Sequence, residues 1–107
     1  MTPTYSKYIP TNEQPVITAL LTALLAAGKT LTINDGEDDI VTSNNLTAII
    51  SELGGTGQDY IKFGGGFFRL IYNNGSEDDP MIVITDCSGN EFCEKILDDL
   101  TNKYGEW

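Results

Sequence analysis

The apolar residues of this 107-residue chain follow two different periods, and the order of these periods restricts the fold more than any other feature. In residues 16–25 and 46–53 they recur at the spacing of one helix face, and residues 90–104 repeat that pattern. Short alternating or β-branched runs between these segments indicate strands. The order helix, hairpin, helix, three strands and helix predicts a single α+β domain, with an antiparallel sheet packed against about three helices.

Turn and cap residues place the ends of these elements. Asp35 and Gly36 suit a tight hairpin turn, and the run of three glycines from Gly64 suits a second turn between strands. The expected helix caps are Thr11 or Asn12 and Ser43 or Asn44, and the expected helix stops are Gly28, Gly54 and Gly105. The expected strands are residues 29–34, 40–42, 60–63, 67–72 and 81–85, and the expected inward stripe of the last helix is Phe92, Ile96, Leu100 and Tyr104.

Length and composition favour one domain with a core of its own. The hydrophobic share of 40% is enough to fill a core at this size. Residues 1–10 follow neither period, so we expect them to form an arm on a single acidic domain of residues 11–107. No apolar stretch approaches the roughly 20 residues of a membrane span, and the N-terminus lacks a signal-peptide pattern. We therefore expect a cytoplasmic protein.

Acidic side chains outnumber basic ones by 16 to 6, which gives a formal charge of -10. This balance argues against direct binding of nucleic acid, which needs cations to neutralise phosphates, and favours a basic protein partner. The negative charges fall into two turn regions and the last expected helix, and the sequence leaves open whether they converge or only maintain solubility. The candidate partner-binding residues are Asp35, Glu37, Asp38 and Asp39, then Glu77, Asp78 and Asp79, then Glu94, Asp98 and Asp99.

Other residue patterns do not support catalysis or a cofactor. The glycine runs lack the strand and helix context of a phosphate-binding loop, and the acidic runs lack the ligand spacing of an EF-hand. Without any His, no Ser or Cys has the usual base, and Asp86 at a strand end is the first candidate should the protein be an enzyme. Cys87 and Cys93 are expected to be reduced structural thiols, with a disulfide as the alternative. We expect no catalytic residue, no metal site and no cofactor.

Three segments carry a resemblance to a known group of proteins. The hairpin at residues 33–37, the strand end at residues 70–75 and the strand at residues 83–86 resemble small uncharacterised acidic accessory proteins of bacteriophages and prophages. In those proteins a Trp-Asp-Gly-Glu hairpin and a Tyr-Gly-Asn-Asp-Gly turn precede a Val-Ile-Ser-Asp strand. Here Asn34 replaces the Trp, and residues 76–80 are inserted.

The resemblance implies a role in the cytoplasm of a bacterial host, such as inhibition of host defence. Small acidic anti-CRISPR and anti-restriction proteins often imitate the charge of DNA, so it implies a non-enzymatic inhibitor of a basic, nucleic-acid-handling complex. Lys62 and Arg69 lie in expected strands, which favours a local acidic patch over imitation of a whole duplex.

A structural or oligomeric accessory protein is the alternative function. An exposed sheet face would then be lined by the aromatic residues Phe67, Phe68, Tyr60, Tyr72 and Trp107. Phe67 and Phe68 are adjacent on a strand and must point to opposite faces. One of them therefore needs a cover, either the N-terminal arm with Tyr5 and Tyr8 or a second subunit of a homodimer.

Overall fold

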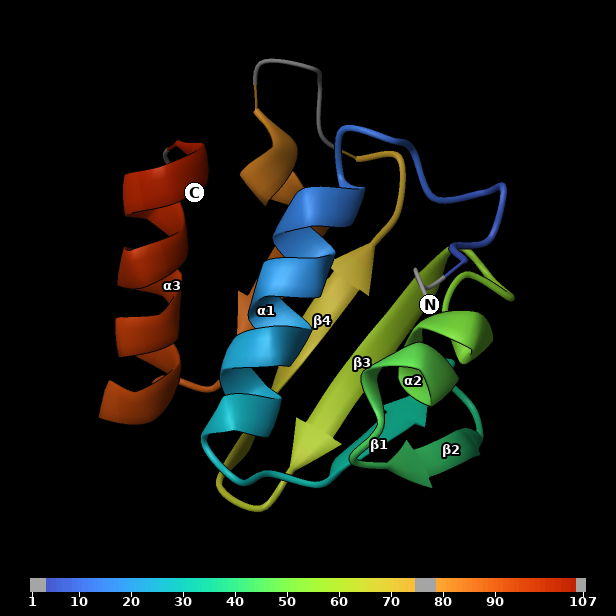
Figure 1. The fold of residues 1–107 in the computed structure, drawn as a ribbon, viewed down its shortest axis with the longest axis horizontal. Helices are drawn as coiled ribbons and strands as arrows, with labels where there is room; N and C mark the ends of the chain where they lie inside the picture. Colours follow the sequence, from blue (N-terminus) through green and yellow to red (C-terminus); the bar gives the residue numbers. More distant parts are fainter. Residues whose placement is uncertain (1–3, 75–78, 106–107) are drawn as a thin grey trace.

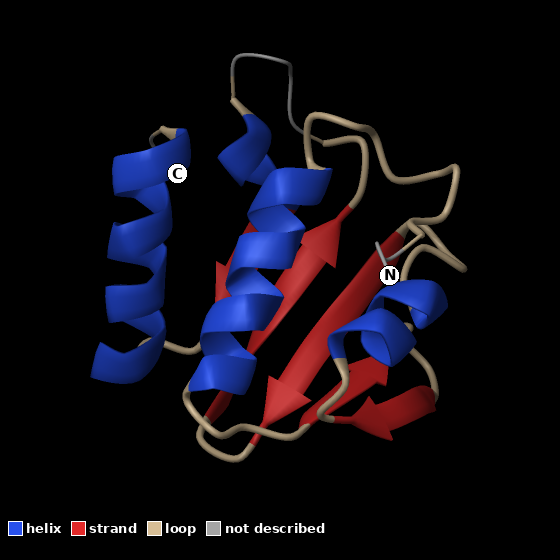
Figure 2. Ribbon diagram, viewed as in Figure 1, coloured by secondary structure: helices blue, strands red, loops and turns tan. Residues whose placement is uncertain are grey.

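The computed structural model describes residues 4–74 and 79–105, and within them it has two layers. The elements in order are α1 (Gln14–Ala26), β1 (Leu31–Asn34), β2 (Asp39–Ser43), α2 (Leu46–Glu52), β3 (Gln58–Phe63), β4 (Gly66–Ile71), the 3-10 helix η1 (Pro80–Val83), β5 (Ile84–Cys87) and α3 (Glu91–Tyr104). The strands form one antiparallel sheet in the order β2-β1-β3-β4-β5. The three α-helices lie on the same face of this sheet (Figures 1 and 2). The predicted α+β fold is confirmed.

The core fills the space between the helices and the sheet. Strand residues alternate between this buried side and the opposite side, as the pleat of a strand requires. The fully buried residues of α1 are Val16, Ile17, Leu20, Leu21 and Leu24, and those of the strands facing them include Leu31, Ile33, Ile61, Phe68 and Leu70. No described helix covers the opposite side of the sheet, which we call the open face.

Both predicted helix caps are wrong. The residue before α1 is Glu13, which makes no capping hydrogen bond because its carboxylate accepts from the loop after β4 instead. Asn45 caps α2, with its side chain accepting from the N–H of Ala48 at 2.9 Å. The glycine stops are in place, since Gly28 and Gly54 follow their helices at φ +82 and +78.

Three further details differ from the expectation. The first part of the predicted last strand is the 3-10 helix η1, because Pro80 has a helical φ and cannot donate to a strand ladder. The β1–β2 loop has four residues rather than the expected five, because β2 begins at Asp39 and not at Ile40. The buried stripe of α3 is Cys93, Ile96, Leu97 and Leu100, so Phe92 and Tyr104 are only partly buried at its margin.

The N-terminal arm packs on the helix side of the molecule. Ile9 is buried in the core, and the Tyr5 hydroxyl donates to the backbone oxygen of Gln14 in α1. Ser6 donates to the backbone oxygen of Gly54 in the loop between α2 and β3. The described part of the arm therefore does not cover the open face of the sheet. No helix in residues 4–74 or 79–105 is both long and apolar enough to cross a membrane.

Candidate functional site

The β1–β2 loop presents acidic side chains on a well-defined turn. Asp35 Oδ1 accepts from the backbone N–H groups of Glu37 and Asp38 at 2.9 and 2.8 Å, and these bonds hold the pKa of Asp35 below its usual value. The N–H of Asp35 donates to the backbone oxygen of Asp38, and Gly36 has φ +105. Asp35 therefore shapes the turn, while the exposed side chains of Glu37 and Asp38 project from its tip.

Asp39 has a different role at the start of β2. Its Oδ1 accepts from Asn34 Nδ2 at 2.8 Å and lies 3.0 Å from Lys62 Nζ on β3. The Asn34 hydrogen bond and then Lys62 lower the pKa of Asp39. Because Lys62 offsets its charge, Asp39 contributes less to the field outside the molecule than Glu37 and Asp38 do.

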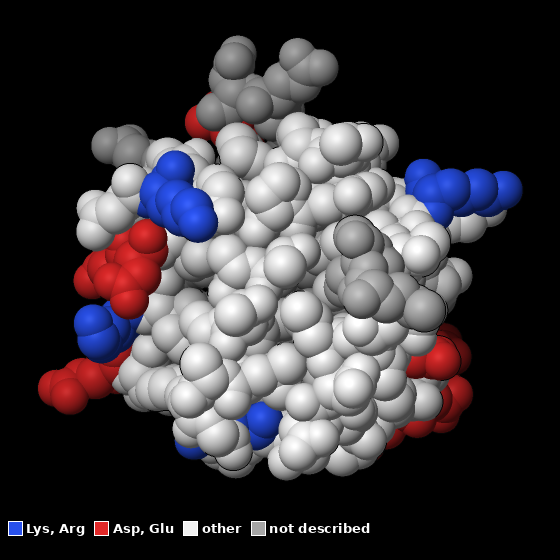
Figure 3. All heavy atoms as spheres, in the orientation of Figure 1, with Lys and Arg blue, Asp and Glu red and all other residues white. Residues whose placement is uncertain are grey.

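The remaining predicted acidic residues lie elsewhere. Glu94, Asp98 and Asp99 are exposed on α3, where Lys95 lies 3.8 Å from Asp99, and Asp79 is exposed just before η1. Glu77 and Asp78 lie outside the described residues. Acidic spheres gather on opposite sides in Figure 3, over α3 and beside α2 and the β1–β2 hairpin. The hairpin and helix groups do not converge on one face.

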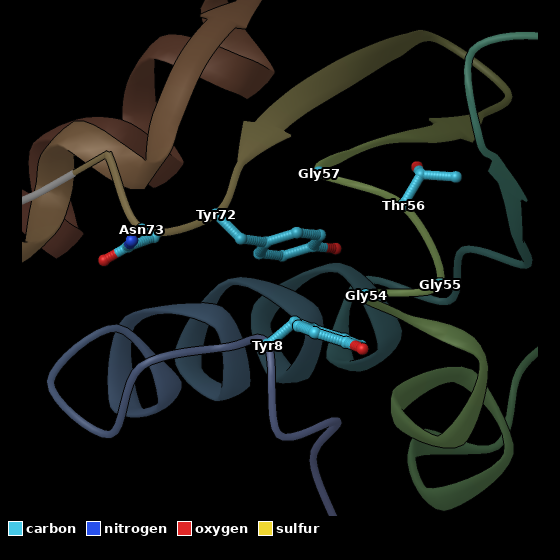
Figure 4. Close-up of a pocket in the computed structure, with 7 residues that line it drawn as sticks. All are labelled: Tyr8, Gly54, Gly55, Thr56, Gly57, Tyr72 and Asn73. Carbon is cyan, nitrogen blue, oxygen red and sulfur yellow. The ribbon is translucent and has the colours of Figure 1, made fainter.

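Two hollows adjoin on the hairpin side of the molecule and share Thr56. The first, of about 310 Å³, is lined by Asp35, Gly36, Glu37, Thr56 and Gln58. The second, of about 360 Å³, is lined by Tyr8, Gly54, Gly55, Thr56, Gly57, Tyr72 and Asn73. We call the second hollow the tyrosine pocket. Figure 4 shows Tyr8 and Tyr72 on opposite sides of it, with both hydroxyls directed toward the glycine loop.

A buried carboxylate, Asp59, lies behind the wall of the tyrosine pocket. Its Oδ2 accepts from the N–H of Gly54 at 3.0 Å and from the hydroxyl of Tyr72 at 2.6 Å. Asp59 is fully buried, and its Oδ1 has no hydrogen-bond partner among the described residues. Burial raises the pKa of Asp59, with a smaller contribution from the charge of Asp35. Burial and the adjacent Asp59 also raise the pKa of Tyr72.

A second buried carboxylate, Glu13, joins the arm to the other end of the pocket. It accepts from the N–H groups of Asn73 and Asn74 at 2.8 and 3.1 Å. Neither carboxylate is among the residues predicted from the sequence, although each leaves a signal there. Asp59 takes an inward position in the alternation of β3, and Glu13 lies one helical turn before the buried Val16.

The open face of the sheet carries two aromatic side chains, Tyr60 and Phe67. They are half-buried, with ring centroids 6.2 Å apart, and a hollow of about 470 Å³ lies beside them. Arg69 lies 5.6 Å from the Tyr60 ring and donates to Gln58 Oε1 at 2.7 Å. Of the other aromatic residues proposed for this face, Phe68 and Tyr72 are buried on the helix side, and Trp107 lies outside the described residues.

The residues considered for other chemistry are the two cysteines and Asp86. Cys87 and Cys93 are free thiols whose pKa values are raised by burial. Asp86 is exposed opposite Arg69 in the sheet register, and it accepts from the N–H of Cys87. The described part of the chain contains no group of three or more His, Cys, Asp or Glu side chains placed to hold a metal ion.

Comparison of the chain with protein-family models, curated proteins and solved structures gives no match, so its own geometry carries the functional argument.

Proposed function

We propose that this chain is a non-enzymatic protein-binding module that docks a basic partner through its β1–β2 hairpin. The observation that carries this proposal is the turn fixed by Asp35, which holds Glu37 and Asp38 at an exposed tip. A preformed acidic loop loses little conformational freedom on binding, so more of the charge attraction contributes to affinity. The net charge of -10 adds long-range attraction for a cationic surface.

The hairpin is a better docking site than the acidic face of α3. On α3, Lys95 lies near Asp99, and Lys103 occupies the last turn, so cations alternate with the carboxylates. At the tip of the hairpin the two exposed side chains are both acidic. Glu37 lines the first hollow, which shares Thr56 with the tyrosine pocket. A partner can therefore find charge and shape in the same place.

The partner that fits this surface is a basic protein of a nucleic-acid-handling complex in a bacterial host cell. A surface that binds DNA or RNA carries clustered cations, and an acidic loop docked on it competes with the nucleic acid. The phage-protein resemblance of the hairpin motif supports the same role. The chain would then act as a stoichiometric inhibitor or adaptor of the anti-CRISPR or anti-restriction kind, without direct contact to nucleic acid.

The test is capture of partners by the tagged full-length protein from a nuclease-treated bacterial lysate. Bound proteins are eluted with increasing salt and identified by mass spectrometry. We expect a basic, nucleic-acid-handling complex that elutes as salt rises, because salt screens exposed charges. Recovery of the protein alone, or of a partner that resists salt, would contradict the proposal.

A second candidate function rests on the open sheet face with Tyr60 and Phe67. Half-buried aromatic side chains on an uncovered face are typical of an interaction surface. A second copy of the chain would make this protein an oligomeric accessory protein. Sedimentation over a range of protein concentrations at low and high salt tests this function, because an apolar dimer persists when charges are screened. A monomer at every concentration would exclude self-association.

A further inference from the structure

We infer that the tyrosine pocket is a binding site for the guanidinium group of an arginine on the basic partner. This inference rests on the proposed function, because the arginine belongs to the segment that docks on the β1–β2 hairpin. Its basis is the hydrogen-bonding character of the pocket wall, the two tyrosine rings, and the position of the pocket beside the hairpin.

Several hydrogen-bond donors in the pocket wall already donate to acceptors within the protein. The Gly54 N–H and the Tyr72 hydroxyl both donate to Asp59, and the Asn73 N–H donates to Glu13. The Thr56 hydroxyl donates to the backbone oxygen of Gln58. A Tyr72 hydroxyl whose hydrogen is committed to Asp59 offers only its lone pairs to a ligand. These walls therefore favour a ligand that donates hydrogen bonds, and disfavour an anion such as phosphate.

The buried carboxyl groups behind the pocket wall also favour a cationic ligand over an anion. Asp59 and Glu13 are both fully buried beside lining residues, and Asp59 Oδ1 lacks a partner among the described residues. In the low dielectric of the interior, a cation bound nearby interacts with these carboxylates more strongly than it would in water.

Aromatic rings form the two sides of the pocket. Tyr8 is 65% exposed and Tyr72 is buried, so the pocket has one outer and one inner ring (Figure 4). The Nζ atom of Lys7 lies 5.3 Å from the centroid of the Tyr8 ring, which is within the distance of a cation–π contact. A guanidinium group is planar and stacks on aromatic faces better than an ammonium group, so arginine fits this space better than lysine.

The pocket continues into the acidic hairpin. Thr56 lines both hollows, and Asp35 and Glu37 line the one on the hairpin side. A basic segment lying along the hairpin therefore reaches the tyrosine pocket across a single residue. The acidic side chains on this path are Asp35 and Glu37, at its hairpin end.

The experiment uses a short peptide of lysines and glycines with one central arginine, and the same peptide with citrulline at that position. Citrulline keeps the shape of arginine and lacks its charge. Binding to the full-length protein is followed by NMR, at the amides of Gly55, Gly57, Glu37 and Asp38 and the ring of Tyr8. We expect the arginine peptide to shift all of these signals, and to bind roughly fivefold to tenfold more tightly than the citrulline peptide.

Tyr8→Ala should remove most of this preference for arginine over citrulline. Tyr104→Ala is the matched control, because Tyr104 also has a lysine over its ring, Lys103 at 5.4 Å, and lies outside the pocket. The Tyr104→Ala variant should retain the full preference.

The outcomes separate the two proposals. Equal binding of both peptides, with shifts at Glu37 and Asp38 only, would overturn the arginine pocket and leave the hairpin proposal standing. If neither peptide binds, the arginine pocket and the hairpin proposal are both overturned. A preference for arginine that Tyr8→Ala leaves unchanged would place the arginine elsewhere and also overturn the pocket.

Discussion

Asp59 occupies a position in β3 where the alternation of the strand calls for an apolar side chain. Its neighbours two and four residues along, Ile61 and Phe63, point to the same side of the sheet. The carboxylate compensates for its burial by accepting from Gly54 and Tyr72, which ties the glycine loop to the end of β4. A buried carboxyl group is costly unless it is hydrogen-bonded, so we interpret Asp59 as a residue that holds the tyrosine pocket in shape.

Asp59→Asn tests the charge separately from the hydrogen bonds. Burial raises the Asp59 pKa above its ordinary value of 3.8. At a pH between 3.8 and this raised pKa, the folded protein therefore holds a proton that the unfolded chain releases. This residue therefore makes the wild type less stable as pH rises through that window. We expect the free energy of unfolding of Asp59→Asn, relative to wild type, to increase in urea titrations as the pH rises above the ordinary Asp pKa of 3.8.

Asp59→Ala is the companion variant, because it removes the acceptor as well. Leaving the Gly54 N–H and the Tyr72 hydroxyl without a partner should cost about 1–3 kcal/mol for each group. A pH-independent difference between Asp59→Asn and wild type, or equal stability of the Asn and Ala variants, would contradict this view of Asp59.

Gly54 and Gly55 form a matched pair in the glycine loop. Gly54 has φ +78, and a Cβ there would lie 2.9 Å from Ser6 Cβ and 3.0 Å from Ile9 Cγ1. Gly54→Ala should therefore lower the free energy of unfolding by about 1–3 kcal/mol and shift the NMR signals of the arm. A Cβ on Gly55 would meet nothing within 4 Å, so Gly55→Ala should stay within about 0.5 kcal/mol of wild type. Equal effects would show that the arm does not pack on Gly54.

At the level of elements, Glu13 links the start of α1 to the loop after β4. Glu13→Ala removes the acceptor of two backbone N–H groups and should cost about 1–3 kcal/mol in urea unfolding. The amides of Asn73 and Asn74 should also exchange faster with solvent. Glu52→Ala, an exposed glutamate at the end of α2, is the control and should change stability by less than about 0.5 kcal/mol. Unchanged exchange at Asn73 and Asn74 would contradict the link.

Two adjacent phenylalanines lie on opposite faces of the sheet, so alanine substitutions there compare how much each face contributes to stability. Phe68 is fully buried under the helices, so Phe68→Ala should cost about 3–5 kcal/mol. Phe67 is half-buried on the open face, so Phe67→Ala should cost only about 1 kcal/mol in the same urea titration. A loss at Phe67 as large as that at Phe68 would mean that a second subunit covers this face.

Apolar periodicity predicts the kinds of elements well, because burial against one sheet face requires it. The stripe of α1 and the alternation of β3 and β4 are examples. The exact caps depend on contacts distant in sequence, which periodicity does not contain. Glu13 accepts hydrogen bonds from Asn73 and Asn74, which lie 60 and 61 positions further along the chain. Pro80 converts part of the expected last strand into η1.

For the whole molecule, the sheet order decides which charges can act together. β2 forms one edge of the sheet, while α3 packs against α1 and η1 toward the other edge. The sequence identifies the acidic groups but not their separation, because separation follows from strand pairing. The sequence also cannot bring Tyr8 and Thr56 together in one pocket, since the arm and the glycine loop meet only in the folded chain.

The most direct test of the proposed function compares two charge reversals in the lysate capture experiment at one low salt concentration. Glu37→Lys with Asp38→Lys reverses the hairpin tip, and Glu94→Lys with Asp98→Lys makes the same change in charge on α3. We predict that the hairpin variant loses the nucleic-acid-handling partner, while the α3 variant retains it, because only the hairpin forms the docking surface. Retention of the partner by the hairpin variant, or equal loss from both variants, would contradict the proposal.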